Sequence, residues 1–404
     1  MRKFIPKFVF DIYHYLLALM GALIYGFPAK KLIVIGVTGT NGKSTVVHLT
    51  TEILESAGNK VASLSSIRFK IGDKEQKNML KMTMPGRFKL QKFLRQAVDT
   101  GCKYAVLEIT SEGIKQYRHK FIDFDGVAFT NLTKEHIEAH KGFENYKKAK
   151  GKLFQALEKS KKKNRFAIIN IDDPNFEYFS GLFSGKEYFY GIDNKNAEIT
   201  PEKINPQIKL LGKFNTYNAL AAACVGLSQG IDLPEVLEVL RNAKGIPGRM
   251  ELVIDKPFKV YVDYAHTPDA LEKVYNTLGK GLICVFGSCG GGRDKWKRPE
   301  MGKIATDYCR EVILTNEDPY DENPSQILSD IKSGIQNSKF EIRNLYKIID
   351  RREAINKALS LARSNDTVII TGKGCEPWMV VADGKKIAWD DKKIVREEFE
   401  KIHG

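Results

Sequence analysis

The sequence predicts an α/β protein in which a mostly parallel sheet is covered by helices and is followed by a second α/β domain. Three observations support this. Short apolar runs alternate with helical stretches between residues 32 and 240, as in parallel strands joined by crossover helices. A glycine-rich turn follows the first run. After Gly245-Ile-Pro-Gly248, which marks a boundary, a second set of apolar runs begins.

The individual elements follow from these runs. We expect strands at 32–35, 104–107, 126–129 and 167–170 in the first domain, and at 259–262, 282–286, 311–314 and 367–370 in the second. Helices are expected from Val46 toward Leu54 and over the alanine-rich stretch 218–226. The predicted organisation is a hydrophobic segment at 1–30, a central domain at 31–245 and a C-terminal domain at 246–404, with a hinge near Ala243–Gly248.

Composition bounds the class of protein. A chain of 404 residues can hold two or three domains with full cores. The net charge is +15 and is spread along the chain, apart from a run at Lys159–Lys163 that has no interleaved aromatic residues. We therefore expect no nucleic-acid partner, and the charge suits nucleotides and acidic precursors. The six cysteines show no zinc spacing, so reduced thiols are expected.

The N-terminal segment is unusually apolar. Residues 15–27 form an uncharged run that is extended upstream by Phe8–Phe10 and interrupted by Asp11 and His14. A run of about 10–14 residues is more typical of an interfacial or buried helix than of a membrane span. No cleavage site for a signal peptide follows. An interfacial membrane helix, a helix packed on the domain and a true span all remain open. We expect a cytoplasmic protein, with peripheral contact at the inner membrane face in the first case.

The stretch Gly36–Thr45, GVTGTNGKST, joins an expected strand to an expected helix. Its glycines let backbone N–H groups close on phosphate oxygens, and the helix N-terminus adds partial positive charge. Lys43 would reach the β- and γ-phosphates, and Ser44 would hold Mg²⁺. The strict spacing GxxxxGK[ST] fails because Val37 replaces the first glycine. The central domain is therefore predicted to be P-loop-type, with ATP bound by Gly39, Thr40, Asn41, Gly42, Lys43, Ser44 and Thr45.

This variant spacing resembles the Mur ligases, ATP-dependent amide-forming enzymes of peptidoglycan precursor synthesis. Folylpolyglutamate synthases and cyanophycin synthetases share the signature. Short segments matching the Mur pattern follow in order over residues 32–400. They are most similar to the UDP-N-acetylmuramoyl-tripeptide synthetase (MurE) branch. The resemblance implies a Rossmann-like C-terminal domain that binds the amino acid.

Three residues are candidates for catalysis and metal binding beside Lys43 and Ser44. Glu108 ends a buried strand, where an unpaired carboxylate would be costly. His136 lies in TNLTKEHIE, which is similar to the family's TNxTxDHxD, and Lys150 lies in YKKAKGKLF, which is similar to YxxAKxx[LI][FY]. The resemblance implies that Glu108 and His136 hold a second Mg²⁺ and that Lys150 carries a CO₂-derived carbamate. The alternative is that Lys150 belongs to a charged helix surface, with lysines 141, 147, 148 and 152.

Further segments carry expected nucleotide contacts. Asn215 and Asn218, in GKFNTYNALAA, offer paired amides suited to an adenine edge. Arg249, in GRME, is the expected phosphate-side cation. Asp263 and His266, in VDYAHTPDA, would contact the ribose and phosphates in the way that the resemblance implies.

The resemblance to the Mur ligases also implies which residues bind the two substrates. Ser111 and Arg118 would contact the muramoyl-peptide. Arg293, in FGSCGGGRDKWKRP, would bind the α-carboxylate of the incoming amino acid. Asp318, Gly372 and Glu376 would complete this pocket, the last two in GKGCE, where cysteine replaces the family's histidine.

Two departures from the family matter. Where diaminopimelate-adding enzymes carry DNPR, this chain reads Glu317-Asp-Pro-Tyr320, so the arginine for a distal carboxylate is missing and carboxylates surround the position. A basic amino acid such as lysine or ornithine would fit better. Only 35 residues precede Gly36, so the family's UDP-binding domain is expected to be absent.

The predicted function is that of a ligase that uses ATP and two Mg²⁺ ions. It would join an amino acid to a UDP- or lipid-linked muramoyl-peptide through an acyl phosphate, acting as a monomer. A poly-γ-glutamate-type or folylpolyglutamate-type ligase is the alternative enzyme. A membrane-tethered nucleotide switch without ligase activity is the alternative from another class.

Overall fold

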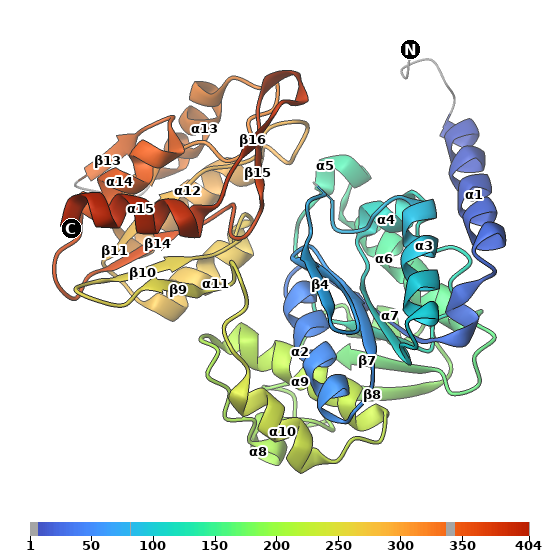
Figure 1. Cartoon of the computed structure of the whole chain (residues 1–404). Helices are drawn as coiled ribbons and strands as arrows, with labels where there is room; N and C mark the ends of the chain where they lie inside the picture. Colours follow the sequence, from blue (N-terminus) through green and yellow to red (C-terminus); the bar gives the residue numbers. More distant parts are fainter. Residues whose placement is uncertain (1–6, 81, 337–343, 404) are drawn as a thin grey trace. The chain divides into compact units, whose positions relative to one another are not determined.

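The computed structural model describes residues 7–80, 82–336 and 344–403 (Figure 1). Contacts divide these residues into two compact units. The first contains the residues up to Lys134, together with Gly142–Lys209 and Lys213–Ala243. The second contains Glu135–Lys141, Leu210–Gly212 and the chain from Lys244 onward. Each unit has its own sheet.

The sheet of the first unit has eight strands in the order β4-β3-β2-β5-β1-β6-β7-β8. The six strands β2, β5, β1, β6, β7 and β8 are parallel to one another. Strands β3 and β4 form an antiparallel hairpin beside β2, at one edge of the sheet. The strands are β1 (Ile33–Thr38), β2 (Val61–Leu64), β3 (Arg68–Ile71), β4 (Lys74–Lys77), β5 (Tyr104–Glu108), β6 (Gly126–Phe129), β7 (Phe166–Asn170) and β8 (Lys186–Tyr190). Strands β2, β5, β6 and β7 are buried along their whole length, because helices cover both faces of a parallel sheet.

Helices connect these strands. They are α1 (Lys7–Ile24), η2 (Pro28–Lys31), α2 (Lys43–Ser56), α3 (Arg87–Asp99), α4 (Ser111–Lys115), α6 (Phe143–Glu158), α7 (Phe176–Ser180), α8 (Pro201–Ile204), α9 (Lys213–Ser228) and α10 (Leu233–Asn242). Helix α2 packs on α9 and α10, and α4 packs on α6. Nine consecutive residues of α9, from Asn218 to Gly226, are buried, as is Asn215, so its small alanines allow close packing on every side.

Helix α1 packs against α3 (Figure 1). Small residues make this contact: Ala18 and Ala22 are buried, and a side chain at Gly21 would lie 3.4 Å from Phe88 Cα. The ring of Tyr15 also lies 5.1 Å from that of Phe121. Among the described residues, none forms a helix with the length and hydropathy needed to cross a membrane.

The second unit has a six-stranded sheet in the order β13-β12-β11-β14-β10-β9, in which only β9 is antiparallel to its neighbour. Its strands are β9 (Glu251–Ile254), β10 (Lys259–Val262), β11 (Leu282–Phe286), β12 (Cys309–Leu314), β13 (Asn344–Lys347) and β14 (Thr367–Ile370), with a separate hairpin of β15 (Trp378–Val380) and β16 (Lys386–Ala388). Its helices are α5 (Ile137–His140), α11 (Pro268–Leu278), α12 (Lys297–Tyr308), α13 (Pro324–Gln336), α14 (Arg351–Leu361), η3 (Ala382–Gly384) and α15 (Asp391–His403).

The predicted α/β class and the eight predicted strands are confirmed. The polar hairpin β3–β4 was not predicted, because its residues RFKI and KEQK lack the apolar runs that mark buried strands. The expectation of reduced thiols is wrong for one pair. Cys284 in β11 and Cys309 in β12 form a disulfide with Cα atoms 6.1 Å apart. These strands are adjacent and parallel, a proximity that cysteine spacing does not reveal.

A buried ion pair joins α14 to α15 in the second unit. Arg351 and Asp391 have fully buried side chains, with Nη2 and Oδ2 2.7 Å apart and Nε and Oδ1 2.9 Å apart. The guanidinium also donates to the carbonyls of Thr371 and Asn316. The pair thus fixes the end of β14 and the loop after β12, which carry pocket residues described below.

Replacing Asp391 with Asn should destabilise the second unit by about 3 kcal/mol, because Arg351 would keep a buried, uncompensated charge. Urea unfolding followed by circular dichroism measures this. The control is Lys273→Gln, which removes an exposed pair with Asp269 and should cost less than about 0.5 kcal/mol. Equal effects of the two substitutions would contradict the structural role given to the buried pair.

Candidate active site

The phosphate loop lies between the end of β1 at Thr38 and the start of α2 at Lys43. Gly39 and Gly42 have φ angles of 148° and 84°. A Cβ at Gly39 would lie 1.9 Å from Thr130 Oγ1, and one at Gly42 would lie 2.2 Å from Asn218 Oδ1. Backbone conformation and space therefore both require glycine at these positions.

Residues after β6 hold this loop in place. The Thr40 N–H donates to the Asn131 carbonyl at 2.8 Å, and the Asn41 N–H donates to Asn131 Oδ1 at 2.9 Å. Gly42 is the N-cap residue of helix α2 and supplies no side-chain cap. The first N–H groups of a helix have no partner within it and carry partial positive charge. Lys43 Nζ, which donates to the Thr40 carbonyl at 2.7 Å, adds a full charge. The loop therefore suits an anion.

Ser44 and Glu108 meet beside the loop. Glu108 is only 3% exposed, and its Oε2 accepts hydrogen bonds from Ser44 Oγ and from the Ser66 N–H, both at 2.8 Å. Ser66 Oγ lies 2.7 Å from Ser44 Oγ. A carboxylate and two hydroxyls form an all-oxygen set of the kind that Mg²⁺ prefers. The prediction missed Ser66, because it lies in a loop with no motif around it.

Lys150 lies under the phosphate loop. Its ammonium donates to the Gly39 carbonyl at 2.5 Å and lies 4.6 Å from the centre of the Tyr146 ring. The Tyr146 hydroxyl in turn lies 3.1 Å from Thr40 Oγ1. Of the five lysines in this part of the chain, all of them described, Lys150 alone is buried. The alternative of a charged helix surface therefore does not apply to Lys150.

Asn215 and Asn218 come from the first turns of α9. Both are 4% exposed, and Asn218 Nδ2 donates to Asn215 Oδ1 at 3.1 Å. Since Asn218 contacts Gly42, the amide pair lies directly behind the phosphate loop. Their adenine contact stays a prediction.

His136 lies on a segment, residues 135–141, whose contacts group it with the second unit. It precedes α5 and has a φ of 54°. Glu135 Oε1 lies 3.0 Å from His266 Nε2. Burial alone would raise the pKa of Glu135, but His136, His266 and Lys297 hold it well below its usual range. Within the described ranges, no three His, Cys, Asp or Glu side chains form a metal-binding group. The role of His136 as a metal ligand stays a prediction.

Asp263 shapes the backbone near Arg249. Its two carboxylate oxygens accept from the Met250 and Ala265 N–H groups at 2.7 and 2.6 Å. Burial raises the pKa of Asp263, although the nearby Arg249 opposes this. Arg249 lies over the Tyr264 ring at 4.3 Å. The structure thus gives Asp263 a positioning role, in addition to its predicted ribose contact.

The predicted acceptor residues surround a dense set of charges in the second unit. Lys373 is fully buried and bridges Asp318, at 3.0 Å, and Glu376, at 2.6 Å. Glu376 also accepts from the Tyr264 hydroxyl at 3.2 Å. Position 372 requires glycine, because its φ is 106° and a Cβ there would lie 2.8 Å from Glu317 Oε2.

Arg293 is the cation on the other side of this set. Burial alone would lower the pKa of its guanidinium, but Cys289, Tyr264 and Glu135 raise it. Burial, with Asp318 and Cys289, also raises the pKa of Tyr320 to about 12. Tyr320 therefore remains a neutral hydroxyl at physiological pH.

The carboxylates near Tyr320 are not equivalent. Asp318 binds Lys373, and Glu322 binds Arg298 with Oε1 at 2.7 Å from Nη1. Glu317 Oε1 accepts from the Cys289 thiol at 2.9 Å, whereas its Oε2 has no hydrogen-bond partner among the residues that the structure describes. Glu317 is 3% exposed. It is thus a buried carboxylate with one oxygen that makes no hydrogen bond to the described residues.

The two residues predicted to contact the muramoyl-peptide lie on or beside α4. Ser111 begins this helix, and Thr110 caps it through the Gly113 N–H. Arg118 donates to the Met84 carbonyl and to Gln116 Oε1. Burial, followed by repulsion from Arg87, lowers the pKa of Arg118. The contact of Ser111 and Arg118 with the muramoyl-peptide stays a prediction.

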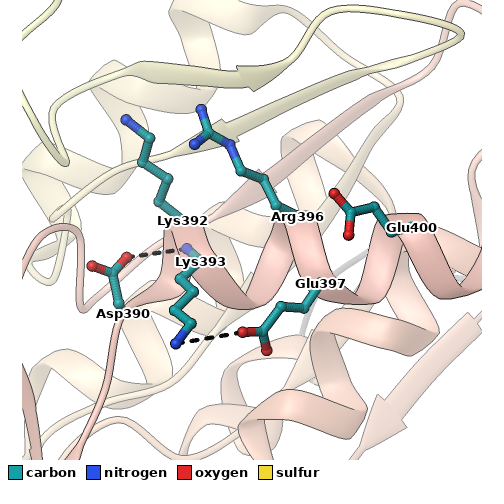
Figure 2. Close-up of a pocket in the computed structure, with 6 residues that line it drawn as sticks. All are labelled: Asp390, Lys392, Lys393, Arg396, Glu397 and Glu400. Carbon is teal, nitrogen blue, oxygen red and sulfur yellow. Dashed lines mark hydrogen bonds and ion pairs between the residues drawn. The ribbon is translucent and has the colours of Figure 1, made fainter.

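A cavity of about 360 Å³ lies elsewhere, along α15 (Figure 2). Its walls are charged side chains of both signs: Asp390, Lys392, Lys393, Arg396, Glu397 and Glu400. Lys393 and Glu397 pair with each other at 3.7 Å. None of the predicted site residues lines it.

Comparisons with known proteins match this geometry. Profiles described as the Mur ligase middle domain and as the Mur ligase, glutamate ligase domain match residues 37–226 and 248–374. The UDP-N-acetylmuramoyl-L-alanyl-D-glutamate–2,6-diaminopimelate ligase of Bacillus cereus is 38% identical, over 94% of this chain and 81% of its own length. A solved structure of a ligase of that name is 32% identical, with a TM-score of 0.59 over 92% of this chain and 79% of the other.

The fold extends to a more distant enzyme. The folylpolyglutamate synthase of Mycobacterium tuberculosis has a TM-score of 0.66 at 14% identity, over 88% of this chain and 92% of its own. At this identity the likeness concerns the fold alone.

Lys43→Ala should weaken binding of a nucleoside triphosphate roughly 10- to 100-fold, since hydrogen bonds to charged groups contribute about 1.5–3 kcal/mol. Calorimetric titration with a non-hydrolysable ATP analogue measures the effect. Lys89→Ala, at an exposed lysine of α3, is the control and should bind as the unmodified protein does. Unchanged affinity in Lys43→Ala, with the fold intact, would refute the phosphate-loop assignment.

Proposed function

The chain belongs to the Mur ligase family and is an ATP-dependent, ADP-forming ligase, and we propose that it adds a basic amino acid to a muramoyl-peptide in peptidoglycan precursor synthesis. One observation supports the choice of amino acid above all. Where the family's diaminopimelate-adding members carry an arginine, this chain has Tyr320. The carboxylate of Glu317, three residues before it, is buried, and its Oε2 has no hydrogen-bond partner among the described residues.

The proposed reaction has two steps. The γ-phosphoryl group of ATP passes to the donor carboxylate, giving an acyl phosphate and ADP. The amino group of the second substrate then attacks the acyl carbon, and inorganic phosphate leaves. Lys43 and the N-terminus of α2 balance charge on the phosphoryl oxygens, and Arg249 is proposed to do the same from the second unit. Such positioned charges are the main source of catalysis in phosphoryl transfer.

Magnesium ions would neutralise charge on the phosphates. Ser44 and Glu108 are proposed to bind the first magnesium ion, because their oxygens lie together beside the loop. His136 and Lys150 are proposed to complete the second site. The all-oxygen arrangement around Glu108 supports magnesium over softer metals.

Lys150 is proposed to be carbamoylated. Carbon dioxide would add to its uncharged amine, with loss of a proton, and replace a cation by an anionic oxygen ligand. The support is its position: the amine is buried and reaches the Gly39 carbonyl in the phosphate loop. An ammonium there would repel a metal ion bound near Ser44, since like charges in a poorly solvated site are costly.

The amino acid is proposed to lie between two opposite charges. Arg293 would bind its α-carboxylate, and Glu317 would bind the ammonium of its side chain. Asp318 and Glu376 already share Lys373, so they attract a further cation less than Glu317 does. Lysine and ornithine have the required distal ammonium, whereas diaminopimelate would bring an additional carboxylate toward Glu317.

The donor is proposed to be a UDP- or lipid-linked muramoyl-peptide that Ser111 and Arg118 contact. We propose that the protein acts as a monomer in the cytoplasm. Peripheral contact of the N-terminal segment with the inner membrane face is proposed because apolar side chains of α1 are exposed.

Glu317→Gln should raise the KM for lysine roughly 10- to 100-fold and leave kcat within a few-fold, because it removes a charged partner worth about 1.5–3 kcal/mol. Amino-acid-dependent ADP formation measures both constants. The control is Asp321→Asn, at an exposed carboxylate that accepts from the Asp383 N–H, and it should change KM less than twofold. Efficient use of diaminopimelate, with lysine and ornithine inert, would overturn the proposed specificity.

Lys150→Ala should be inactive, and short carboxylates such as acetate should restore part of its activity by supplying anionic oxygens. Carbon-13 NMR after incubation with labelled bicarbonate should show one carbamate signal in the unmodified protein, absent from Lys150→Ala. Lys148→Ala, at an exposed lysine on the same helix, is the control and should keep both the signal and the activity. A fully active, metal-bound enzyme without the signal would disprove the carbamate.

A further inference from the structure

Helix α1 exposes a long apolar face. Its exposed large side chains, from 40% to 63% exposed, are Phe8, Val9, Ile12, Tyr13, Tyr15, Leu16, Met20, Leu23 and Ile24. Spacings of three and four residues place most of them in one stripe along the helix. Large contiguous apolar patches on a protein surface mark interaction sites. Among the described residues of α1, the charged Asp11 is half-buried and not part of this stripe.

Apart from Tyr15, whose ring contacts that of Phe121, the stripe has no stated role in attaching α1 to its own unit. Helix α1 packs on α3 (Figure 1), with Gly21 against Phe88 and with Ala18 and Ala22 buried. Because small residues bring the two backbones close, the larger residues of α1 are left on the outer side. The face is thus presented on a fixed support.

Positive charge lies beside the C-terminal end of α1. Lys30 and Lys31 are exposed, and the Lys30 ammonium lies 4.8 Å from the Phe27 ring. Lys162 Nζ donates to the Leu32 carbonyl at 2.5 Å. This hydrogen bond brings the run 159–163 next to the same end, and its lysines at 159, 161 and 163 are exposed. We call these exposed lysines, together with Lys30 and Lys31, the basic rim.

We propose that the stripe of α1 and the basic rim together form a docking surface for an anionic lipid membrane. The stripe would lie in the plane of the interface, with its side chains among the acyl chains and the rim against acidic headgroups. Apolar burial and attraction to anionic lipid act together in such helices. With 18 residues, the helix offers a face about 27 Å long at 1.5 Å per residue.

Charge favours a membrane over a second copy of the chain. Two copies joined through this stripe with their α1 helices parallel would bring two basic rims close, and like charges would oppose that contact. An acidic lipid surface has the opposite sign. The inference rests on the proposed peripheral contact and specifies its residues and lipid charge; it does not depend on the amino acid or donor that the enzyme uses.

Vesicle flotation with the full chain tests the proposal. The probes are neutral phosphatidylcholine vesicles and vesicles that also contain phosphatidylglycerol. The stripe variant is Ile12→Gln, Leu16→Gln and Met20→Gln, three exposed positions whose change should leave the fold and the ligase activity on soluble substrates intact. The matched control replaces three exposed apolar residues of the second unit, Leu252→Gln, Ile349→Gln and Ile387→Gln, which are 43–46% exposed.

The unmodified chain and the control should float with anionic vesicles, at least fivefold more than with neutral ones, and the stripe variant should lose at least fivefold of this binding. Lys30→Gln with Lys31→Gln should reduce the binding and make the remaining binding less sensitive to salt, because two attractive charges are lost. Absence of vesicle binding, or equal binding by the stripe variant, would overturn the proposal. So would a lipid-free dimer, measured by sedimentation, that only the stripe variant abolishes. If the unmodified chain binds vesicles but has no ligase activity, the result would instead count against the proposed function.

Discussion

Two positions where no side chain fits, Gly39 and Gly42, determine the geometry of the first unit's site. Thr130, at the end of β6, occupies the space beside one, and Asn218 of α9 occupies the space beside the other. The loop is therefore tied at once to the neighbouring strand and to a helix far away in sequence. Lys150 is tied to it as well, through the Gly39 carbonyl. A shift of this loop would move each of these groups.

The sheet explains why such distant residues converge. Parallel strands β1, β5 and β6 are neighbours, so their carboxyl ends lie at the same edge, where ligands bind in open α/β sheets. Glu108 ends β5, and the phosphate loop follows β1. The second unit repeats the arrangement: the loops after β11, β12 and β14 carry Arg293, Glu317 and Gly372. In both units, apolar strands supply a rigid base and charged groups lie just beyond it.

Sequence predicted this arrangement where a local pattern carried it. Buried strands appear as short apolar runs, and the loop appears as glycines before Lys43. The sequence did not predict contacts that lack a local pattern. Examples are Ser66 beside Glu108, the Cys284–Cys309 disulfide and the β3–β4 hairpin. The carboxylates near Tyr320 looked alike in sequence. Only the structure distinguishes Glu317, because the cations that bind its neighbours come from Lys373 and Arg298, outside that motif.

The most direct test of the account is the product of a complete reaction. ATP, Mg²⁺, a muramoyl-dipeptide donor in UDP-linked or lipid-linked form, and lysine, ornithine or diaminopimelate would be incubated with the full chain. ADP would be measured beside the mass of the donor. The account predicts ADP formation that depends on lysine or ornithine, with the donor heavier by one such residue. ADP formation indifferent to every amino acid, with the donor unchanged, would mean a nucleotide hydrolase or switch and would contradict the ligase.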